Sequence, residues 1–328
     1  MGSFTDFPYG ITSFGIPVWG DFIGSVYIVA DTASANYKQA LKRFGKAYND
    51  DGTPIFCPHT SSSILVTKNG LKTAIDHCVA DRGDVVIVMP STNTYYIDAA
   101  LALDVKGAKL LCPAGMCGDV GATNAARIQQ ITAATACLAI SGQACEVAGI
   151  FWRGVANTSP ITIAASSHCC SIHHNFIGIT TTTGSATCYG ISGAGESTNL
   201  DIWKNYITVY SPTAGQTIGG GINLANGTRA LIHDNLVTTG GFTQTFGVGI
   251  NVGSGEQSKI TGNTVVENKN NGGSTLSLGI VGTTSSLVAD NRVMMTAANI
   301  ANAISGMHAD NAVQNWGSDG AGGNTILA

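Results

Sequence analysis

The chain has 328 residues, of which only 11% are charged, while glycine accounts for 42. Gly, Ser, Thr and Asn weaken helix interiors, so this composition argues against a helical protein and favours many short strands joined by turns. The net charge is -4, no basic run could neutralise phosphates, and no apolar stretch reaches the roughly 20 residues that span a membrane. We therefore expect neither a nucleic-acid partner nor a membrane partner.

Residues 1–67 are rich in aromatic residues, Pro and Gly, and they lack the periodicity of the rest of the chain. The N-terminus has no basic start and no apolar core, so we expect no secretory signal and synthesis in a cytoplasm. We interpret this region as an extended arm followed by a small module. Five aromatic side chains of the arm are candidate apolar anchors for attachment: Phe4, Phe7, Tyr9, Phe14 and Trp19.

Residues 68–82 form the next predicted unit, a capping segment with an amphipathic helix over residues 70–82. Leu71, Ile75, Cys78 and Val79 share one face of such a helix, and Gly83 would end it. We expect this helix to cover the open strand edges at the start of the domain that follows.

A repeat occupies the second half of the chain. Five segments share the pattern of an aliphatic residue, two variable residues, Asn, one variable residue and an apolar β-former. Their asparagines recur at a nearly constant interval, and they are Asn175, Asn205, Asn235, Asn263 and Asn291. A second element lies between them, at Gly190-Ile191, Gly221-Ile222, Gly249-Ile250 and Gly279-Ile280, with a weaker copy at Ala303-Ile304.

This period indicates a solenoid, and the short β-type runs separated by turn residues indicate coils of strand and turn. We therefore predict an all-β fold, a single-stranded, right-handed parallel β-helix over residues 83–306, with degenerate earlier coils from residue 85. The aliphatic residues would stack inside. Each Asn would sit at a turn in the left-handed backbone that it tolerates, bonded to the Asn of the next coil as a structural ladder.

The last segment, residues 307–328, is rich in Gly, Asn and Asp. We expect a tail that packs on the final coil or on a neighbouring subunit. All nine cysteines lie at or before Cys188, and without a secretory signal we expect most of them to be reduced and buried. A bridge between Cys112 and Cys117 is the alternative.

Two positions of the repeat could carry chemistry. The residue before Asn is Asp234 in one coil and Asp290 two coils later, about 10 Å away, which slightly exceeds the usual separation of an inverting carboxylate pair. Since Asp is also common at solvated turns, we predict no catalytic residue and no enzymatic activity. The residue two before Asn is His173, Trp203 or His233, a ring stripe that could form a subunit contact, a sugar platform or an ordinary sheet-surface ladder.

Residues 168–174 hold metal-type ligands. Strand alternation would send Cys170 and His174 to one side and Cys169 and His173 to the other, so four ligands would not converge. We expect buried cysteines beside exposed histidines, and we predict no metal site and no cofactor.

Residues 7–18, 26–29, 83–90 and 103–108 together resemble the β-helical cement, or decoration, proteins of tailed bacteriophages. The resemblance runs from the N-terminus to about Gln130 and then covers the general pectin-lyase-like β-helix. One departure is Pro90-Ser91-Thr92, where members of that family carry Pro-Gly-His.

The resemblance implies a virion structural protein without catalytic residues. Such a protein is a homotrimer on the capsid exterior, bound to the major capsid protein and stabilising the shell, with the β-helix as an outward knob. The aromatic side chains of the arm would then be capsid contacts. The alternative function is a phage tailspike or tail-fibre protein that binds or cleaves host surface polysaccharide.

Overall fold

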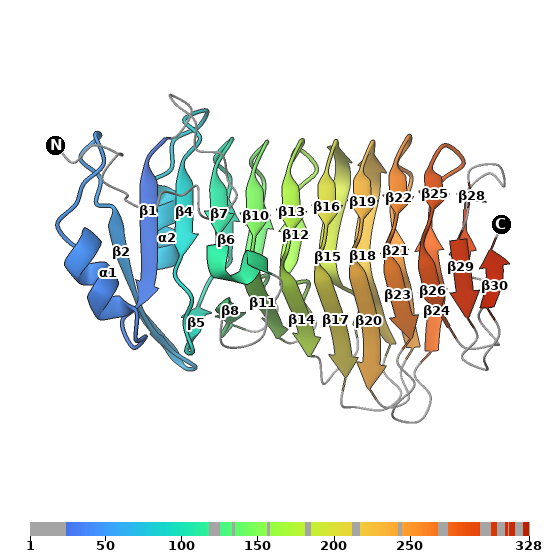
Figure 1. The fold of residues 1–328 in the computed structure, drawn as a ribbon, viewed down its shortest axis with the longest axis horizontal. Helices are drawn as coiled ribbons and strands as arrows, with labels where there is room; N and C mark the ends of the chain where they lie inside the picture. The colour runs from blue at the N-terminus through green and yellow to red at the C-terminus, as the bar shows by residue number, and fades with distance from the viewer. Residues whose placement is uncertain are drawn as a thin grey trace.

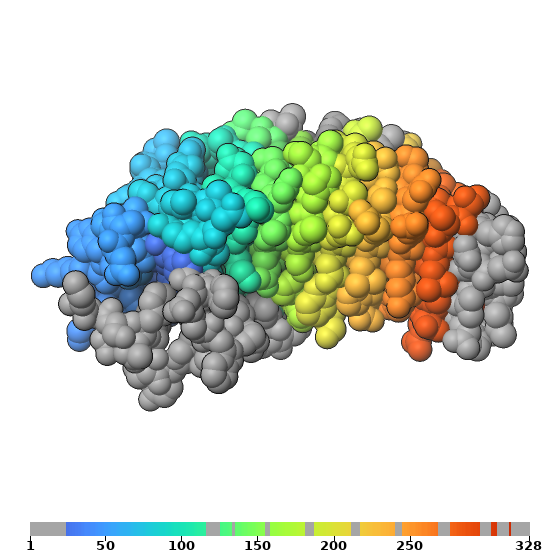
Figure 2. Space-filling view, turned by 90° about the horizontal axis from the view of Figure 1, so that it is seen from above, coloured from blue at the N-terminus to red at the C-terminus, as the bar shows by residue number. Residues whose placement is uncertain are grey.

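The computed structural model describes residues 24–117, 125–132, 135–155, 158–180, 185–211, 217–241, 245–267, 275–295, 303–306, 312–313, 315–318 and 324–327. The chain winds through successive coils, and each complete coil adds one short strand to each of three sheets (Figure 1). The coils form successive bands along one elongated body (Figure 2). The predicted right-handed parallel β-helix is confirmed.

The first sheet has twelve strands: β1 (Val26–Asp31), β2 (Phe56–Ser62), β3 (Leu65–Lys68), β4 (Val85–Val88), β7 (Lys109–Leu111), β10 (Glu146–Ala148), β13 (Ser171–His173), β16 (Asp201–Trp203), β19 (Leu231–His233), β22 (Lys259–Thr261), β25 (Leu287–Ala289) and β28 (Ala312–Val313). The second sheet has ten: β5 (Thr94–Ile97), β8 (Ala126–Gln130), β11 (Ile150–Val155), β14 (Phe176–Thr180), β17 (Tyr206–Ser211), β20 (Leu236–Gly241), β23 (Thr264–Glu267), β26 (Arg292–Met294), β29 (Asn315–Ser318) and β30 (Asn324–Leu327). The third sheet has eight: β6 (Leu101–Leu103), β9 (Leu138–Ile140), β12 (Ile161–Ile163), β15 (Ser185–Thr198), β18 (Thr217–Thr228), β21 (Thr245–Asn251), β24 (Thr275–Val281) and β27 (Ile304–Ser305). Among the described strands, pairing is parallel except for β2–β3 and β29–β30.

The core consists of aliphatic columns that run along the helix axis. In the first sheet, the middle residue of each short strand points inward and pairs with the same residue of the next coil, as in Ile172, Ile202 and Ile232. These side chains are fully buried. The first sheet therefore keeps one register through coils of slightly different length, whereas β15 in the third sheet accommodates extra residues through register shifts against β18.

The Gly of the Gly-Ile element lets the second and third sheets approach each other inside the coil. A Cβ on Gly249 would lie 2.5 Å from Cγ1 of Val265 in the second sheet and 2.6 Å from the carbonyl oxygen of Gly279 in the next coil. Gly190, Gly221 and Gly279 meet equivalent neighbours. Glycine is therefore required at this position of the Gly-Ile element because the narrow interior has no room for a Cβ atom.

Gly249→Ala is therefore expected to lower the free energy of unfolding by about 2–3 kcal/mol, because the neighbouring backbone cannot move aside. Gly107→Ala is the matched control, since Gly107 has a φ of +79° and nothing within 4 Å of the added methyl group. Alanine at position 107 is strained in the left-handed conformation, but it also restricts the unfolded chain, which offsets part of that strain. Gly107→Ala should therefore lower the free energy of unfolding by about 1 kcal/mol or less. Guanidinium denaturation measures both, and equal losses would contradict the packing explanation.

The left-handed residue of each Asn turn is not the Asn, as the sequence analysis expected, but the residue before it. His174, Lys204, Asp234 and Asp290 have φ between +48° and +56°, and Gly262 has +68°. The turn at this residue swings the following Asn side chain into the core, where it meets hydrogen-bond partners. The preceding side chain is left on the outside.

Two α-helices lie at the N-terminal end. In α2 (Gly70–Asp76), Leu71, Ala74 and Ile75 are buried in the same core as the inner columns, so α2 closes the open end of the coil interior. The predicted helix is too long at its C-terminal end, and Val79 is 49% exposed. Its N–H instead donates to the Asp84 carboxylate at 2.6 Å, which takes it out of the helical pattern.

The other helix, α1 (Tyr37–Phe44), packs outside the first sheet with Ala40 against a second apolar cluster that includes Ile28 and Phe56. This helix was not predicted. The sheet also begins before the predicted boundary at residue 83, because β1 pairs in parallel with β4 and with β2. Residues 24–67 therefore contribute strands to the first sheet.

The eight described cysteines carry free thiols, of which only Cys169 is exposed. Cys112 carries one of these free thiols, so the alternative of a Cys112–Cys117 bridge is wrong. Burial raises the pKa of the Cys57 thiol to about 11 and that of Cys78 to about 12, so these side chains act as small apolar groups. Among the described residues, no helix is long and apolar enough to cross a membrane.

Candidate functional site

The ring stripe lies on the outer face of the first sheet, where β13, β16 and β19 pair in register. The His173 and Trp203 rings stack with centroids 4.6 Å apart, and the Trp203 and His233 rings stack at 5.7 Å with only 4° between their planes. Both faces of the indole are therefore covered by imidazoles. Trp203 has no free face for a sugar ring, which removes the simplest form of the sugar-platform alternative.

Carboxylates hold both ends of this stack. Glu146, on β10, accepts from Nε2 of His173 at 3.0 Å and from Nζ of Lys109 at 2.7 Å. Burial raises the pKa of Glu146, but the hydrogen bonds from His173 and Lys109 outweigh it and bring the pKa down to about 2. Glu146 is therefore ionised at neutral pH, and its charge is paired with the Lys109 ammonium.

At the other end, Nδ1 of His233 lies 2.9 Å from Oδ2 of Asp234, and its Nε2 lies 3.3 Å from Oδ1 of Asp201. Asp234, one member of the carboxylate pair considered in the sequence, is thus engaged by a neighbouring imidazole. Asp290 lies two coils further on, beyond Gly262. This arrangement gives Asp234 a structural partner and separates the two carboxylates by a full coil.

His173 and His174 do not diverge as strand alternation predicted. Their Nδ1 atoms lie 2.9 Å apart, because β13 ends at His173 and His174 turns into the left-handed region with φ +52°. The expectation of exposed histidines is also wrong for His173, which is only 5% exposed beneath its neighbours. A relay of polar contacts therefore runs from Lys109 through Glu146 and His173 to His174.

A second row of rings begins the strands of the second sheet. Phe151 and Phe176 lie 4.5 Å apart, Phe176 and Tyr206 lie 4.9 Å apart, and the Arg127 guanidinium lies 5.0 Å from the Phe151 centroid. Beside the turn, a cavity of about 240 Å³ is lined by Gly115, His174, Asn175, Lys204, Asn205, Tyr206, Asp234 and Leu236. The relay therefore ends at an accessible cavity with charged, polar and apolar walls.

The asparagines of the repeat form a buried ladder below this cavity. Each Nδ2 donates to Oδ1 of the Asn in the next coil at 3.0–3.1 Å, from Asn175 through Asn205, Asn235, Asn263 and Asn291 to Asn315. The sequence analysis left out Asn315. It follows Asn291 at a shorter interval than the one that separates the other asparagines, and that shorter spacing hid it.

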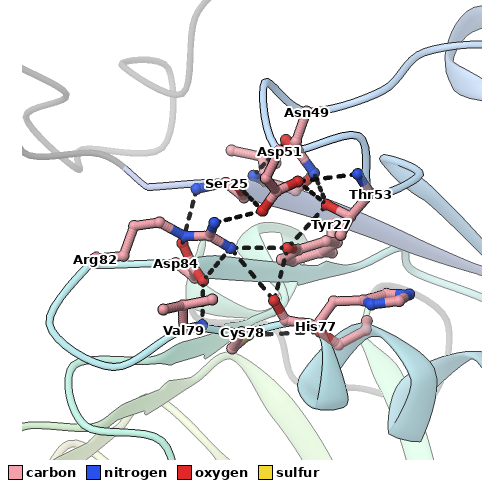
Figure 3. Close-up of polar contacts among 12 residues, drawn as sticks. Ser25, Tyr27, Asn49, Asp51, Thr53, His77, Cys78, Val79, Arg82 and Asp84 are labelled. Carbon is pink, nitrogen blue, oxygen red and sulfur yellow. Dashed lines mark hydrogen bonds and ion pairs between the residues drawn. The ribbon is translucent and has the colours of Figure 1, made fainter.

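A polar clasp, which we define as Ser25, Asp51, Arg82, Asp84 and their hydrogen-bond partners, lies at the N-terminal end (Figure 3). Asp84 is fully buried and accepts four hydrogen bonds. They come from the Ser25 N–H at 2.8 Å, the Val79 N–H at 2.6 Å, and Nε and one terminal nitrogen of Arg82 at 2.6 and 2.8 Å. This bidentate pairing satisfies both carboxylate oxygens.

The Arg82 guanidinium reaches further, to the Asp51 carboxylate and to the hydroxyl of Tyr27 at 3.0 Å (Figure 3). The hydrogen bonds that Arg82 donates to the Asp84 carboxylate are the largest cause that raises the pKa of Arg82, so the guanidinium stays charged. Tyr27 in turn donates to the His77 carbonyl at 2.9 Å. The clasp thus joins β1, the loop before β2, the end of α2 and the start of β4.

The five candidate anchors Phe4, Phe7, Tyr9, Phe14 and Trp19 lie outside the described residues. The clasp holds the first described residues instead: Ser25 through its N–H on Asp84, and Gly24 through its N–H on the Gly83 carbonyl at 3.4 Å. The arm therefore enters the fold at a point bonded to the first complete coils. No sequence signal pointed to this, since the partners are far apart in the chain.

No protein-family model matches the chain, and no curated protein matches it. Among solved structures, one similar fold is a pectin methylesterase in complex with a hexasaccharide, at 11% identity and a TM-score of 0.42, covering 78% of this chain and 86% of that one. Another is ORF18 of Geobacillus virus E2, at 11% identity and a TM-score of 0.37. That match covers 88% of this chain, which spans about 60% of the viral protein.

Proposed function

We propose that this chain is a virion structural protein, a cement or decoration protein that binds and stabilises a capsid shell. The β-helix is the outward knob, and the arm grips the shell through its aromatic side chains. The observation that carries the proposal is the clasp around Asp84, which bonds Ser25, where the arm joins the rod, to several elements of the rod. The resemblance of the N-terminal part of the chain to phage cement proteins supplies the partner, the major capsid protein.

The clasp suits such a role because a pull on the arm first reaches Gly24 and Ser25, whose N–H groups are bonded to Gly83 and Asp84. From there the load passes to the buried Asp84 and to β4, which pairs along its whole length with β1 and over Val85–Ile87 with β7. A solenoid resists such a load because every coil buries its core against the next one. A load on the arm is thereby transmitted to the stiff β-helix.

The test is to add the purified chain to particles that lack it and to measure the copies bound relative to the major capsid protein. The full chain should bind in numbers comparable to the shell protein. Deletion of residues 1–20 should abolish binding while leaving the circular dichroism and the oligomeric state unchanged, because the clasp and all described strands remain.

Ile64→Ser serves as the control, because Ile64 is an apolar side chain 86% exposed at the β2–β3 hairpin, outside the arm. Binding by this variant should match that of the parent chain. Retained binding by the deletion variant would contradict the role of the arm. Binding at a few per cent of the shell copies would favour a position on the tail, and no binding by the full chain would contradict the virion proposal.

We assign the ring stripe to the contact between subunits of a homotrimer. It lies on the outer face of the first sheet, its end rings His173 and His233 are hydrogen-bonded to carboxylates, and its ring faces are already used within the subunit. A tailspike or tail-fibre protein that binds or cleaves host polysaccharide is the second candidate. The cavity at His174, Lys204 and Tyr206 favours it, since sugar ligands use such mixtures of polar groups and rings.

A further inference from the structure

The meeting of two imidazoles at the turn after β13 has no role in the proposed attachment. His173 is the last residue of the strand and His174 the first of the turn, yet their Nδ1 atoms are 2.9 Å apart. The left-handed backbone at His174, with φ +52°, brings the Nδ1 atoms of these adjacent residues together. Two nitrogen donors are thereby presented together beside the cavity.

We propose that His173 and His174 chelate a divalent copper or nickel ion. Imidazole nitrogens bind first-row metals at roughly 2.0–2.1 Å. Two such bonds at a right angle place the nitrogens about 2.9 Å apart, whereas a tetrahedral angle needs about 3.4 Å. The observed separation therefore matches the square-planar or tetragonal geometry of Cu²⁺ and Ni²⁺ better than the tetrahedral geometry of Zn²⁺.

The partners of His173 prepare it to act as a ligand. The Glu146 carboxylate accepts a hydrogen bond from Nε2 of His173 at 3.0 Å, and Nδ1 is the atom that faces His174. Lys109 fixes the other carboxylate oxygen at 2.7 Å, and Trp203 stacks on the ring. A carboxylate on the far nitrogen of a ligating histidine is the usual way in which proteins orient such a ligand.

His174 supplies access to the metal. It lines the cavity together with Asp234 and Tyr206, whose oxygens could complete the coordination with water. Within the described residues no group of three or more His, Cys, Asp or Glu gathers as metal ligands, so the chelate rests on two protein nitrogens.

The test is a titration of the full, untagged chain with Cu²⁺ after a chelator has removed any bound metal. Calorimetry measures the binding, and electron paramagnetic resonance reports the coordination. One equivalent of Cu²⁺ should bind, with a spectrum showing nitrogen coordination. His174→Gln should remove that equivalent. Glu146→Gln should weaken binding roughly 10–100-fold, because it removes the group that orients His173. Lys204→Met should strengthen binding, because it removes a positive charge from the cavity wall.

His168→Gln is the control, since that histidine is hydrogen-bonded to Thr198 and takes no part in the pair. This variant should keep the equivalent with unchanged affinity. Binding that survives His174→Gln, or that ignores Glu146→Gln, would show an adventitious surface histidine and overturn the proposal. Absence of binding by the parent chain would show that the 2.9 Å contact is only an N–H···N hydrogen bond. Circular dichroism verifies that each variant is folded.

Discussion

Asn235→Ala is expected to lower the free energy of unfolding by about 3–5 kcal/mol, because alanine would leave several buried hydrogen-bonding groups unpaired. Each unpaired group costs about 1–3 kcal/mol, and water that enters the site offsets part of the total. The Asn235 side chain is 1% exposed, and its Nδ2 donates to the Ile202 carbonyl at 2.8 Å and to Oδ1 of Asn263 at 3.0 Å. Its Oδ1 accepts from the backbone N–H and from Nδ2 of Asn205, both at 3.0 Å.

Asn199→Gly is the matched control for this variant. Asn199 is also an asparagine at a coil turn, but it is exposed and has φ +54°, a conformation that glycine adopts without strain. Its loss should stay below about 1 kcal/mol. The midpoint of guanidinium denaturation compares the two variants, and similar midpoints would mean that the ladder contributes little to stability.

Asp84→Ala should be comparably severe, with a loss of about 3–5 kcal/mol, because it removes one partner from a buried ion pair. The Ser25 and Val79 N–H groups lose their acceptor, and Arg82 keeps its charge with only Asp51 as an ionic partner. Local opening should follow where the arm joins the rod. We therefore expect the Ser25 amide to exchange its hydrogen faster, in addition to a lower denaturation midpoint.

An exposed ion pair provides the control for that variant. Asp76 pairs with Lys72 in α2, with both side chains more than half exposed, so Asp76→Ala should cost about 0–0.5 kcal/mol. Protection of the Ser25 amide should be unaffected by it. If Asp84→Ala were no more harmful than Asp76→Ala, the clasp could not be what secures the arm to the first coils.

The repeat made the fold predictable from the sequence. A solenoid places the same residue of each coil in the same environment, so the aliphatic, Asn and Gly-Ile positions recur along the chain with the period of the structure. Those positions determined the inner columns and the asparagine ladder. The identity of the left-handed residue was missed, because His, Lys, Asp and Gly all occupy it and no single residue type marks it.

The clasp could not be predicted in the same way. Asp84 bonds Ser25, and Arg82 bonds Asp51, between segments that lie far apart in the chain. None of these residues belongs to the repeat. The succession Arg82-Gly83-Asp84 is equally typical of a solvated turn, so it does not indicate a buried ion pair. Only the stacking of β1 beside β4 brings the four residues together.

The amino-acid sequence by itself determined the class of fold, its period and the contents of its core, because inward-facing positions accept few residue types and repeat them. Tertiary structure alone decided which outer side chains meet. Outer positions tolerate many residue types, so their pattern carries little information, and their contacts depend on turns and on strands from distant coils. The pairing of His173 with His174, the engagement of Glu146 and the anchoring of Ser25 are all of this kind.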